Sequence, residues 1–224
     1  MTKLYYADVS PLEDDSVFER YFSLMSEHRR QKIDRLRFRK DKNLSLGAGL
    51  LLNEGLSAYG LTEREMQYGI YENEKPYFIN CPQLHFNLSH SGSKVMAVFS
   101  DREVGCDIEQ INGQNLKLAQ RFFRDSEYRS ILVSPEPEQT FTRLWTLKES
   151  FMKATGLGMK LPMNGFEIRL GETVSVVQSV SEQRYSFVEP ELYTGYKCAA
   201  CIAGDIGDYN IVEVTFGSPG NIVS

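Results

Sequence analysis

The chain has 224 residues and a hydrophobic share of 42%, which is enough for one large domain or two small ones with a real core. Its formal net charge is −5 and its pI is about 5.4, so we do not expect nucleic acid as a partner. No apolar run approaches the roughly 20 residues of a membrane span, and the N-terminus lacks the layout of a signal peptide. We therefore expect a cytoplasmic protein without a membrane partner.

The four cysteines fit that expectation, because they do not form a metal or disulfide pattern. Cys198 and Cys201 make a Cys-x-x-Cys pair, but the sequence offers no second pair of cysteines or histidines to complete a zinc site. They fall in an apolar run over residues 196–203 that is typical of a buried strand. We interpret them as small buried thiols in a reducing compartment.

The first part of the chain is predicted to combine a strand with three helices. Residues 3–8 indicate a strand, 11–25 a helix, about 26 onward a second, basic helix, and 44–59 an apolar helix that ends near Gly60. The basic run allows two interpretations: a solvated face, or a landing site for a polyanion smaller than nucleic acid. Its cations are Arg29, Arg30, Lys32, Arg35, Arg37, Arg39, Lys40 and Lys42.

Residues 70–108 are predicted to be strands and turns. A turn falls within 70–79, and the segment 85–92 indicates a strand that gives way to a turn beside His90, where the ring can donate a hydrogen bond to a phosphate. The Ser89-His90 pair might suggest a hydrolase, but no nucleophile elbow surrounds the serine. Residues 95–99 and 104–108 are predicted to pair as an antiparallel hairpin.

Acidic side chains mark a short strand and a later helix. Asp107 and Glu109 are two positions apart, so on a strand both project from one face. The apolar pattern around Trp145 indicates a helix, with Glu149 at the edge of its apolar face. Each motif alone is usually a solvated surface, but three converging carboxylates would make an oxygen-rich site for a hard cation such as Mg²⁺, with Mn²⁺ as a possible substitute.

We expect the two lysines of that helix, Lys148 and Lys153, to have different roles. Lys148 falls in the middle of the apolar face, where an ammonium group needs a partner, so we expect it to be structural and paired with an acid in the core. Lys153 lies one turn after Glu149, at the edge of the face.

The remaining elements complete an α+β pattern. Helices are predicted over 116–123 and 126–133, and strands of a final antiparallel sheet over 161–170, 174–177, 185–188 and 196–203. No Gly-rich phosphate loop occurs. The order of elements predicts two α+β halves of similar size with the active site in the cleft between them.

The two acidic motifs together resemble the 4′-phosphopantetheinyl transferases, in particular the Sfp-like, surfactin-synthetase-activating group. The resemblance rests on Gly105-Cys106-Asp107-Ile108-Glu109 and on Trp145-Thr146-Leu147-Lys148-Glu149-Ser150-Phe151-Met152-Lys153, and it extends to Asn-Leu-Ser-His-Ser at 87–91. It implies a pseudo-twofold monomer split near Glu103, with residues 1–103 on the nucleotide side of coenzyme A and 104–224 carrying the metal and catalytic acids.

The resemblance also implies a coenzyme A site. Arg29 and Lys32 match residues that bind the 3′-phosphate side, Ser45 matches a hydroxyl residue near the nucleotide, and Lys75 matches a lysine that reaches the pyrophosphate. Glu74 replaces the glycine that usually precedes this lysine, which puts the local backbone in question. The implied coenzyme A set is Arg29, Lys32, Ser45, Lys75, Pro76, Ser89, His90 and Lys153.

The implied reaction moves 4′-phosphopantetheine onto a serine of an apo acyl or peptidyl carrier protein and releases adenosine 3′,5′-bisphosphate. Mg²⁺ would be held by Asp107, Glu109 and Glu149. Glu149 would take the serine proton, directly or through a metal-bound water, and the carrier would land near residues 116–123. The implied catalytic set is Glu149, Asp107, His90 and Lys153.

Two other functions use the same residues. A metal-dependent pyrophosphatase would release the nucleotide from coenzyme A without a carrier. A non-catalytic coenzyme A binding module would have no activity to lose when Glu149 is changed.

Overall fold

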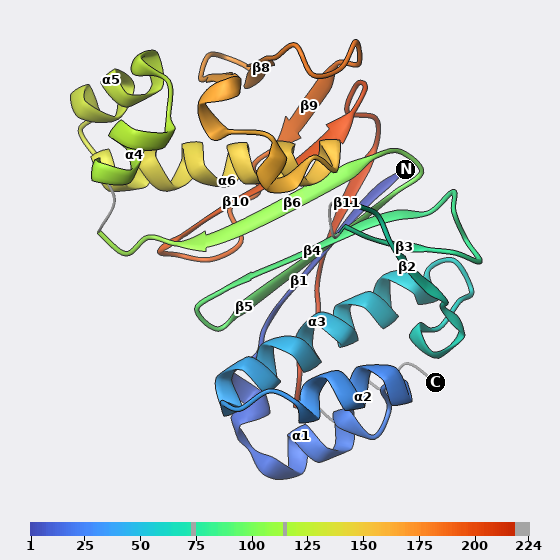
Figure 1. Cartoon of the computed structure of the whole chain (residues 1–224). Helices are drawn as coiled ribbons and strands as arrows, with labels where there is room; N and C mark the ends of the chain where they lie inside the picture. Colours follow the sequence, from blue (N-terminus) through green and yellow to red (C-terminus); the bar gives the residue numbers. More distant parts are fainter. Residues whose placement is uncertain (73–74, 114–115, 218–224) are drawn as a thin grey trace.

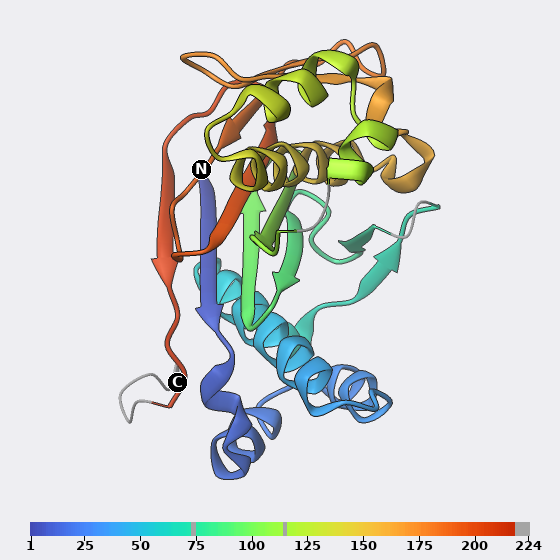
Figure 2. The same cartoon turned by 90° about the vertical axis from the view of Figure 1, so that its left-hand side faces the viewer.

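The computed structural model describes residues 1–72, 75–113 and 116–217. It is a mixed α+β fold in two halves, as the order of elements predicted (Figure 1). Figure 2 shows helices α1–α3 at one end of the molecule and α4–α6 at the other, with the main strands between them.

The first half is built on a four-stranded sheet with the order β11-β1-β5-β4. β1 (Thr2–Asp8), β5 (Lys94–Ser100) and β4 (His85–Ser91) are antiparallel neighbours. The long helix α3 (Arg39–Ser57) packs on this sheet, and its leucines at 46, 51, 52 and 56 are fully buried. This apolar helix face explains why residues 44–59 are helical.

The helix predicted over residues 11–25 is wrong as a single element. The structure has a 3₁₀ turn η1 (Ser10–Glu13) and a separate helix α1 (Asp15–Phe22). Asp14 lies between them in an extended conformation, and its carboxylate accepts hydrogen bonds from the backbone N–H groups of Ser16 and Val17. A side chain that caps the first turn of a new helix stops the preceding turn from continuing into it.

The basic run is also divided between two helices. α2 (Glu27–Asp34) starts at Ser26, whose hydroxyl accepts from the backbone of Arg29 at 3.1 Å, and α3 begins only at Arg39. After α3 come the 3₁₀ turn η2 (Glu63–Glu65) and a small hairpin of β2 (Tyr68–Ile70) and β3 (Pro76–Phe78). The turn predicted within residues 70–79 falls between these two strands, and its residues 73 and 74 lie outside the described part of the chain.

The second half is built on a three-stranded sheet with the order β6-β10-β9 and on helix α6 (Pro137–Thr155). β6 (Val104–Gln110) pairs antiparallel with β10 (Tyr196–Ala203), and β10 with β9 (Tyr185–Val188). α6 packs closely on β6, because a Cβ at Gly105 would collide with the backbone of Ser150 and Ala154. Gly105 therefore lets the helix approach the strand.

Two predicted pairings in the sheets are wrong. β6 does not form a hairpin with β5, although the two are consecutive along the chain, because its backbone pairs with β10 instead. The 3₁₀ turn η3 (Gly158–Lys160) precedes the segment 161–170, which consists of the 3₁₀ turn η4 (Met163–Gly165) and only a short strand β7 (Glu167–Arg169). β7 pairs with β8 (Ser175–Val177) in a sheet of its own.

The remaining elements are two helices and one unpredicted strand. α4 (Leu116–Phe122) and α5 (Asp125–Val133) pack beside α6. β11 (Tyr209–Glu213) returns to the first half, where it runs parallel to β1. The division at residue 103 stays a prediction. Within the described ranges, no helix combines the length and apolar character needed to cross a membrane.

Candidate active site

The acids of β6 and α6 meet in a hollow of about 350 Å³ between the two halves. β4 from the first half supplies one wall, while β6 and α6 from the second half supply the others. This arrangement brings together all four of the predicted catalytic residues. The lining residues are Leu88, Ser89, His90, Asp107, Glu109, Trp145, Glu149 and Lys153.

Asp107 and Lys153 form the ion pair at the floor of the hollow. The Lys153 ammonium lies 2.6 Å from Asp107 Oδ1 and also donates to the Ser89 hydroxyl at 3.2 Å. Burial alone would lower the pKa of Lys153, but the Asp107 carboxylate raises it above the usual value. Lys153 is therefore a fixed positive charge inside the hollow.

The surroundings of Glu109 and Glu149 disfavour the charged form of both carboxylates. Burial, followed by the nearby charge of Asp107, raises the pKa of Glu149. Burial also raises the pKa of Glu109, with a hydrogen bond from Ser91 opposing the shift. Burial and the charge of the neighbouring acids both favour the protonated form of these carboxylates. A bound cation or a proton would therefore stabilise them.

His90 stands at the rim of the hollow on β4, between Ser89 and Ser91. Partial burial and then the Lys153 charge lower the pKa of its ring. The imidazole is therefore neutral near pH 7, where it can still donate one N–H to an anion.

The oxygen set of the hollow fits a hard divalent cation. In the described part of the chain, no cluster of three or more His, Cys, Asp or Glu side chains is already drawn together around one point. However, Asp107 Oδ2 is buried and has no hydrogen-bond partner. A buried carboxylate oxygen is rarely left unsatisfied, and three carboxylates lining one hollow are the ligands that Mg²⁺ prefers. The residues that could hold it are Asp107, Glu109 and Glu149.

The nucleotide-side residues carry unused hydrogen-bonding capacity. Arg29 is 7% exposed, and its Nε is buried with no hydrogen-bond partner, 3.7 Å from a Glu63 oxygen. The Ser45 hydroxyl on α3 is likewise buried and unpartnered. Lys32 is exposed on α2, and burial of its ammonium, followed by the charge of Arg29, lowers its pKa.

Lys75 is not among the residues that line the hollow. Its ammonium donates to Glu103 at 2.9 Å and to the backbone oxygens of Val104 and Ala154 at 3.2 and 3.3 Å. It thus joins the start of β6 to the end of α6, and its role at the pyrophosphate stays a prediction. Pro76 is exposed at the start of β3, and Glu74 lies outside the described residues.

Lys148 is a core residue, as predicted. It is fully buried, and its ammonium lies 2.8 Å from a Glu127 oxygen of α5. It also donates to the backbone oxygens of Met163 and Phe166 at 2.7 and 3.0 Å. Cys198 and Cys201 are buried in β10 as predicted, and burial raises the pKa of Cys198 to about 12.

Sequence reasoning missed Asn87 and Ser91 as parts of the site. The Ser91 hydroxyl donates to Glu109 at 2.7 Å, and the Asn87 side-chain oxygen accepts from the backbone of Cys106 at 3.0 Å. The available signal was the spacing of two residues between Asn87, Ser89 and Ser91, which places all three on one face of a strand.

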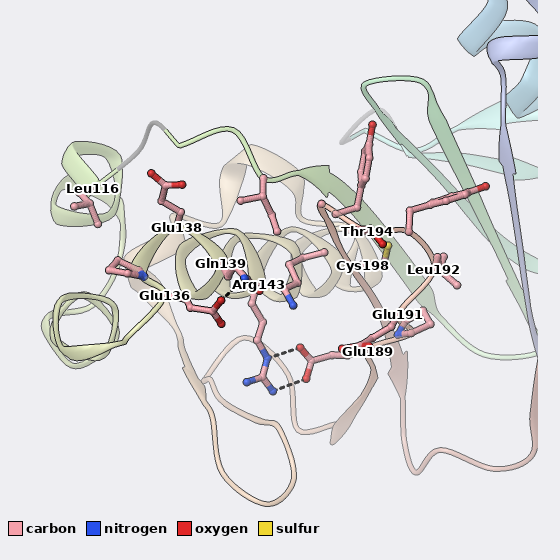
Figure 3. Close-up of a pocket in the computed structure, with 17 residues that line it drawn as sticks. Leu116, Glu136, Glu138, Gln139, Arg143, Glu189, Glu191, Leu192, Thr194 and Cys198 are labelled. Atoms are coloured by element: carbon pink, nitrogen blue, oxygen red, sulfur yellow. Dashed lines mark hydrogen bonds and ion pairs between the residues drawn. The ribbon is translucent and has the colours of Figure 1, made fainter.

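A larger groove, of about 1270 Å³, opens between the start of α6 and residues 189–197 (Figure 3). Arg143 spans it in a two-pronged ion pair with Glu189 at 2.6 and 2.7 Å. Two cations, Arg143 and Lys197, line the groove with four glutamates, and Arg143 is already held in that pair. The groove therefore suits an anionic diphosphate poorly. The additional acids of the groove are Glu136, Glu138 and Glu191.

Comparisons with known proteins define the class. The model of the 4′-phosphopantetheinyl transferase superfamily matches residues 103–201, and the model of the 4′-phosphopantetheinyl transferase N-terminal region matches residues 10–102. The chain is 35% identical to 4′-phosphopantetheinyl transferase Sfp of Bacillus subtilis over 83% of this chain and 85% of that protein. It is 33% identical to 4′-phosphopantetheinyl transferase gsp of Aneurinibacillus migulanus over 90% and 86% of the two chains.

The chain therefore belongs to the 4′-phosphopantetheinyl transferases, enzymes that move phosphopantetheine from coenzyme A to carrier proteins. The Sfp-like resemblance is confirmed by these relatives. A solved structure of Thermotoga maritima holo-[acyl-carrier-protein] synthase also matches, with 19% identity and a TM-score of 0.39 over 46% of this chain and 64% of that one.

Proposed function

We propose that this enzyme transfers 4′-phosphopantetheine from coenzyme A to a serine of an apo acyl or peptidyl carrier protein with the help of Mg²⁺, and releases adenosine 3′,5′-bisphosphate. The observation that carries the proposal is the hollow that joins three carboxylates, Lys153 and His90, with Asp107 Oδ2 left unpartnered. A diphosphate needs a site that neutralises charge on both sides of the bond that breaks.

The charged residues of the hollow and His90 have defined tasks in this scheme, and Glu149 has two. Asp107, Glu109 and Glu149 would hold the cation, which when bound would neutralise charge on the pyrophosphate oxygens. Lys153 would offset the charge that develops on the leaving phosphate, and the neutral His90 ring would donate a hydrogen bond to a phosphate oxygen. Glu149 would receive the proton of the carrier serine, because burial and Asp107 raise its proton affinity.

The nucleotide end of coenzyme A would lie against α2 and α3. Arg29 has an Nε and Ser45 a hydroxyl without a hydrogen-bond partner, and Lys32 adds an ammonium on α2, so that together they supply donors for a 3′-phosphate. Such donors would distinguish coenzyme A from dephospho-coenzyme A.

The carrier would land on α4, close to the hollow. α4 exposes apolar and basic side chains together: Leu116 and Phe122 with Lys117 and Arg121. This mixture would suit a small acidic helical partner. We also propose that the enzyme is a monomer and that it works in the cytoplasm. The cytoplasmic location fits its four free and buried cysteines.

An intact-mass assay tests the proposal. The protein is incubated with MgCl₂, coenzyme A and an apo acyl carrier protein, and the carrier should gain the mass of one phosphopantetheine. Chelation of the metal should stop the gain and added Mg²⁺ should restore it, and Asp107→Ala should abolish transfer. Dephospho-coenzyme A should show a higher KM than coenzyme A.

Two results would count against the proposal. Release of adenosine 3′,5′-bisphosphate from coenzyme A without any carrier would indicate a pyrophosphatase. Equal KM values for coenzyme A and dephospho-coenzyme A would remove the 3′-phosphate assignment while leaving the transfer reaction in place.

A further inference from the structure

Strands β4 and β6 lie side by side where the two sheets meet (Figure 1). Each is the edge strand of its own sheet, and no backbone pairing joins them among the residues that the structure describes. An edge strand presents a row of backbone N–H groups that need partners when they are buried. The row on β6 must therefore be satisfied by something other than a neighbouring backbone.

Side chains of β4 take that place. The Asn87 side-chain oxygen accepts from the backbone N–H of Cys106 at 3.0 Å, the Ser89 hydroxyl from Ile108 at 3.4 Å, and the Ser91 hydroxyl from Gln110 at 3.1 Å. Each pair is separated by 19 positions. The constant separation means that the two strands run parallel and in register. We call Asn87, Ser89 and Ser91 the side-chain ladder.

The two serines of the ladder also reach the acids. The Ser89 hydroxyl donates to Asp107 Oδ1 at 2.8 Å, and the Ser91 hydroxyl donates to Glu109 Oε2 at 2.7 Å. A hydroxyl has one proton to donate, so each serine accepts from the β6 backbone while it commits that proton to a carboxylate. One oxygen of each acid is thereby fixed in direction.

The result of this arrangement is clearest at Asp107. Its Oδ1 is occupied by Ser89 and Lys153, whereas its Oδ2 is buried without a partner. The ladder therefore turns one oxygen toward the protein and leaves the other available for a ligand. Outer hydrogen-bond partners of this kind fix the orientation of metal-binding carboxylates and tune metal affinity.

We propose that the side-chain ladder positions the Asp107 and Glu109 carboxylates for the divalent cation, with Asn87 and Ser91 acting as positioning residues. The inference rests on the proposed function, because it assumes that these acids hold a metal. It also explains why the β5–β6 hairpin does not form: β6 already has partners on both sides, with the backbone of β10 on one and the ladder on the other.

The test uses Trp145, which is the one tryptophan of the sequence and lines the same hollow. Mn²⁺ quenches tryptophan emission, so a titration with Mn²⁺ reports metal binding without any transfer reaction. Ser91→Ala should raise the Kd for Mn²⁺ about 10-fold to 100-fold, as loss of an outer partner does at other metal sites. Ser91→Thr keeps the hydroxyl and should restore the affinity to within about threefold of the unmodified protein.

Kinetics add a readout that a merely structural role would not move. In Ser91→Ala, the Mg²⁺ concentration for half-maximal transfer should rise by the same factor as the Kd for Mn²⁺. The kcat at saturating Mg²⁺ should stay close to that of the unmodified protein. Asn87→Ala should act in the same direction if it folds, and Ser91→Ala, which removes only one hydroxyl, keeps the inference testable if it does not.

Ser100→Ala is the matched control. The Ser100 side chain is buried on β5, and the hydrogen bonds of its hydroxyl reach the Thr2 hydroxyl at 3.1 Å, Asp101 and the backbone of Arg102. Ser100 is not among the residues that line the hollow. This change should leave Mn²⁺ affinity unaltered. If Ser91→Ala binds Mn²⁺ as tightly as the unmodified protein, the ladder inference is wrong and the proposed function stands. If the unmodified protein transfers phosphopantetheine without any divalent cation, the metal assignment fails and the ladder inference fails with it.

Discussion

The two sides of helix α6 carry similar ion pairs that are used differently. On the inward side, the Lys148 ammonium is saturated by Glu127 and two backbone oxygens, and Glu127 in turn accepts from the backbone of Ile168 at 2.7 Å and of Arg124 at 2.8 Å. On the side facing the hollow, Lys153 pairs with Asp107, but Asp107 Oδ2 has no partner. A fully satisfied pair specifies how elements pack, whereas an incompletely satisfied pair marks a place for a ligand.

A substitution on the side of α6 that faces the hollow should have the largest effect on the rate of transfer. Glu149→Gln keeps the shape of the side chain but removes the group that would accept the serine proton. We expect kcat to fall about 10²-fold to 10⁴-fold, the usual contribution of a general base. The free energy of unfolding should not decrease, because burial and Asp107 already disfavour the charged form of Glu149. Steady-state kinetics and urea unfolding measure the two effects.

Glu138→Gln is the control for that variant. Glu138 is exposed near the start of the same helix, and its change should leave kcat unaltered. If Glu149→Gln lowered the free energy of unfolding by as much as it raised the activation free energy of transfer, the two sides of α6 would not differ as described.

The inward side should show the opposite behaviour. Lys148→Met removes one partner of a buried pair and leaves the Glu127 carboxylate without its counter-charge. We expect the free energy of unfolding to fall by about 3 to 5 kcal/mol. Urea unfolding measures this loss.

The double change Lys148→Met with Glu127→Leu should recover most of that stability, because two apolar side chains can replace a buried pair. A single variant as stable as the unmodified protein would contradict the structural role of Lys148.

A partly buried ion pair in the first half, between Asp8 and Lys94, should give the smallest of these effects. Burial would raise the pKa of Asp8, but hydrogen bonds from Lys94 and Ser10 lower it from 3.8 to about 2. A lowered folded-state pKa stabilises the protein above the unfolded value, and this contribution is lost as the pH falls from about 4 to about 2. Because Asp8 is 38% exposed, Asp8→Asn should cost less than about 1 kcal/mol at pH 7.

Urea unfolding of both proteins at several pH values measures this difference. The gap between Asp8→Asn and the unmodified protein should shrink in the acid range. A gap that stays constant with pH would mean that the charge of Asp8 does not stabilise the fold.

The local parts of the site were predictable from the sequence. Alternation put Asp107 and Glu109 on one strand face, and the helical period put Lys148 inward and Glu149 at the edge. These predictions succeed because each depends on a single element whose repeat is visible in the chain.

The parts that depend on two elements were not predictable in the same way. Nothing in the spacing shows that Asn87, Ser89 and Ser91 would meet the backbone of β6, because hydrogen bonds between strands of different sheets leave no period. The parallel pairing of β11 with β1 and the contact of Lys75 with the end of α6 are also hidden, because they join segments that lie far apart in the sequence. The division of the first predicted helix was visible in Asp14, which is a favoured capping residue.

The strand β11 has a consequence for how the protein can be handled. It leaves the second half and forms the outer edge of the sheet that belongs to the first. A fragment cut at residue 103 would therefore keep an incomplete sheet, and the complementary fragment would carry a strand with no surface to pair with. The two fragments should therefore bind each other in solution. A reporter attached after residue 217 would lie beside the half that contains α2 rather than the half that contains α6.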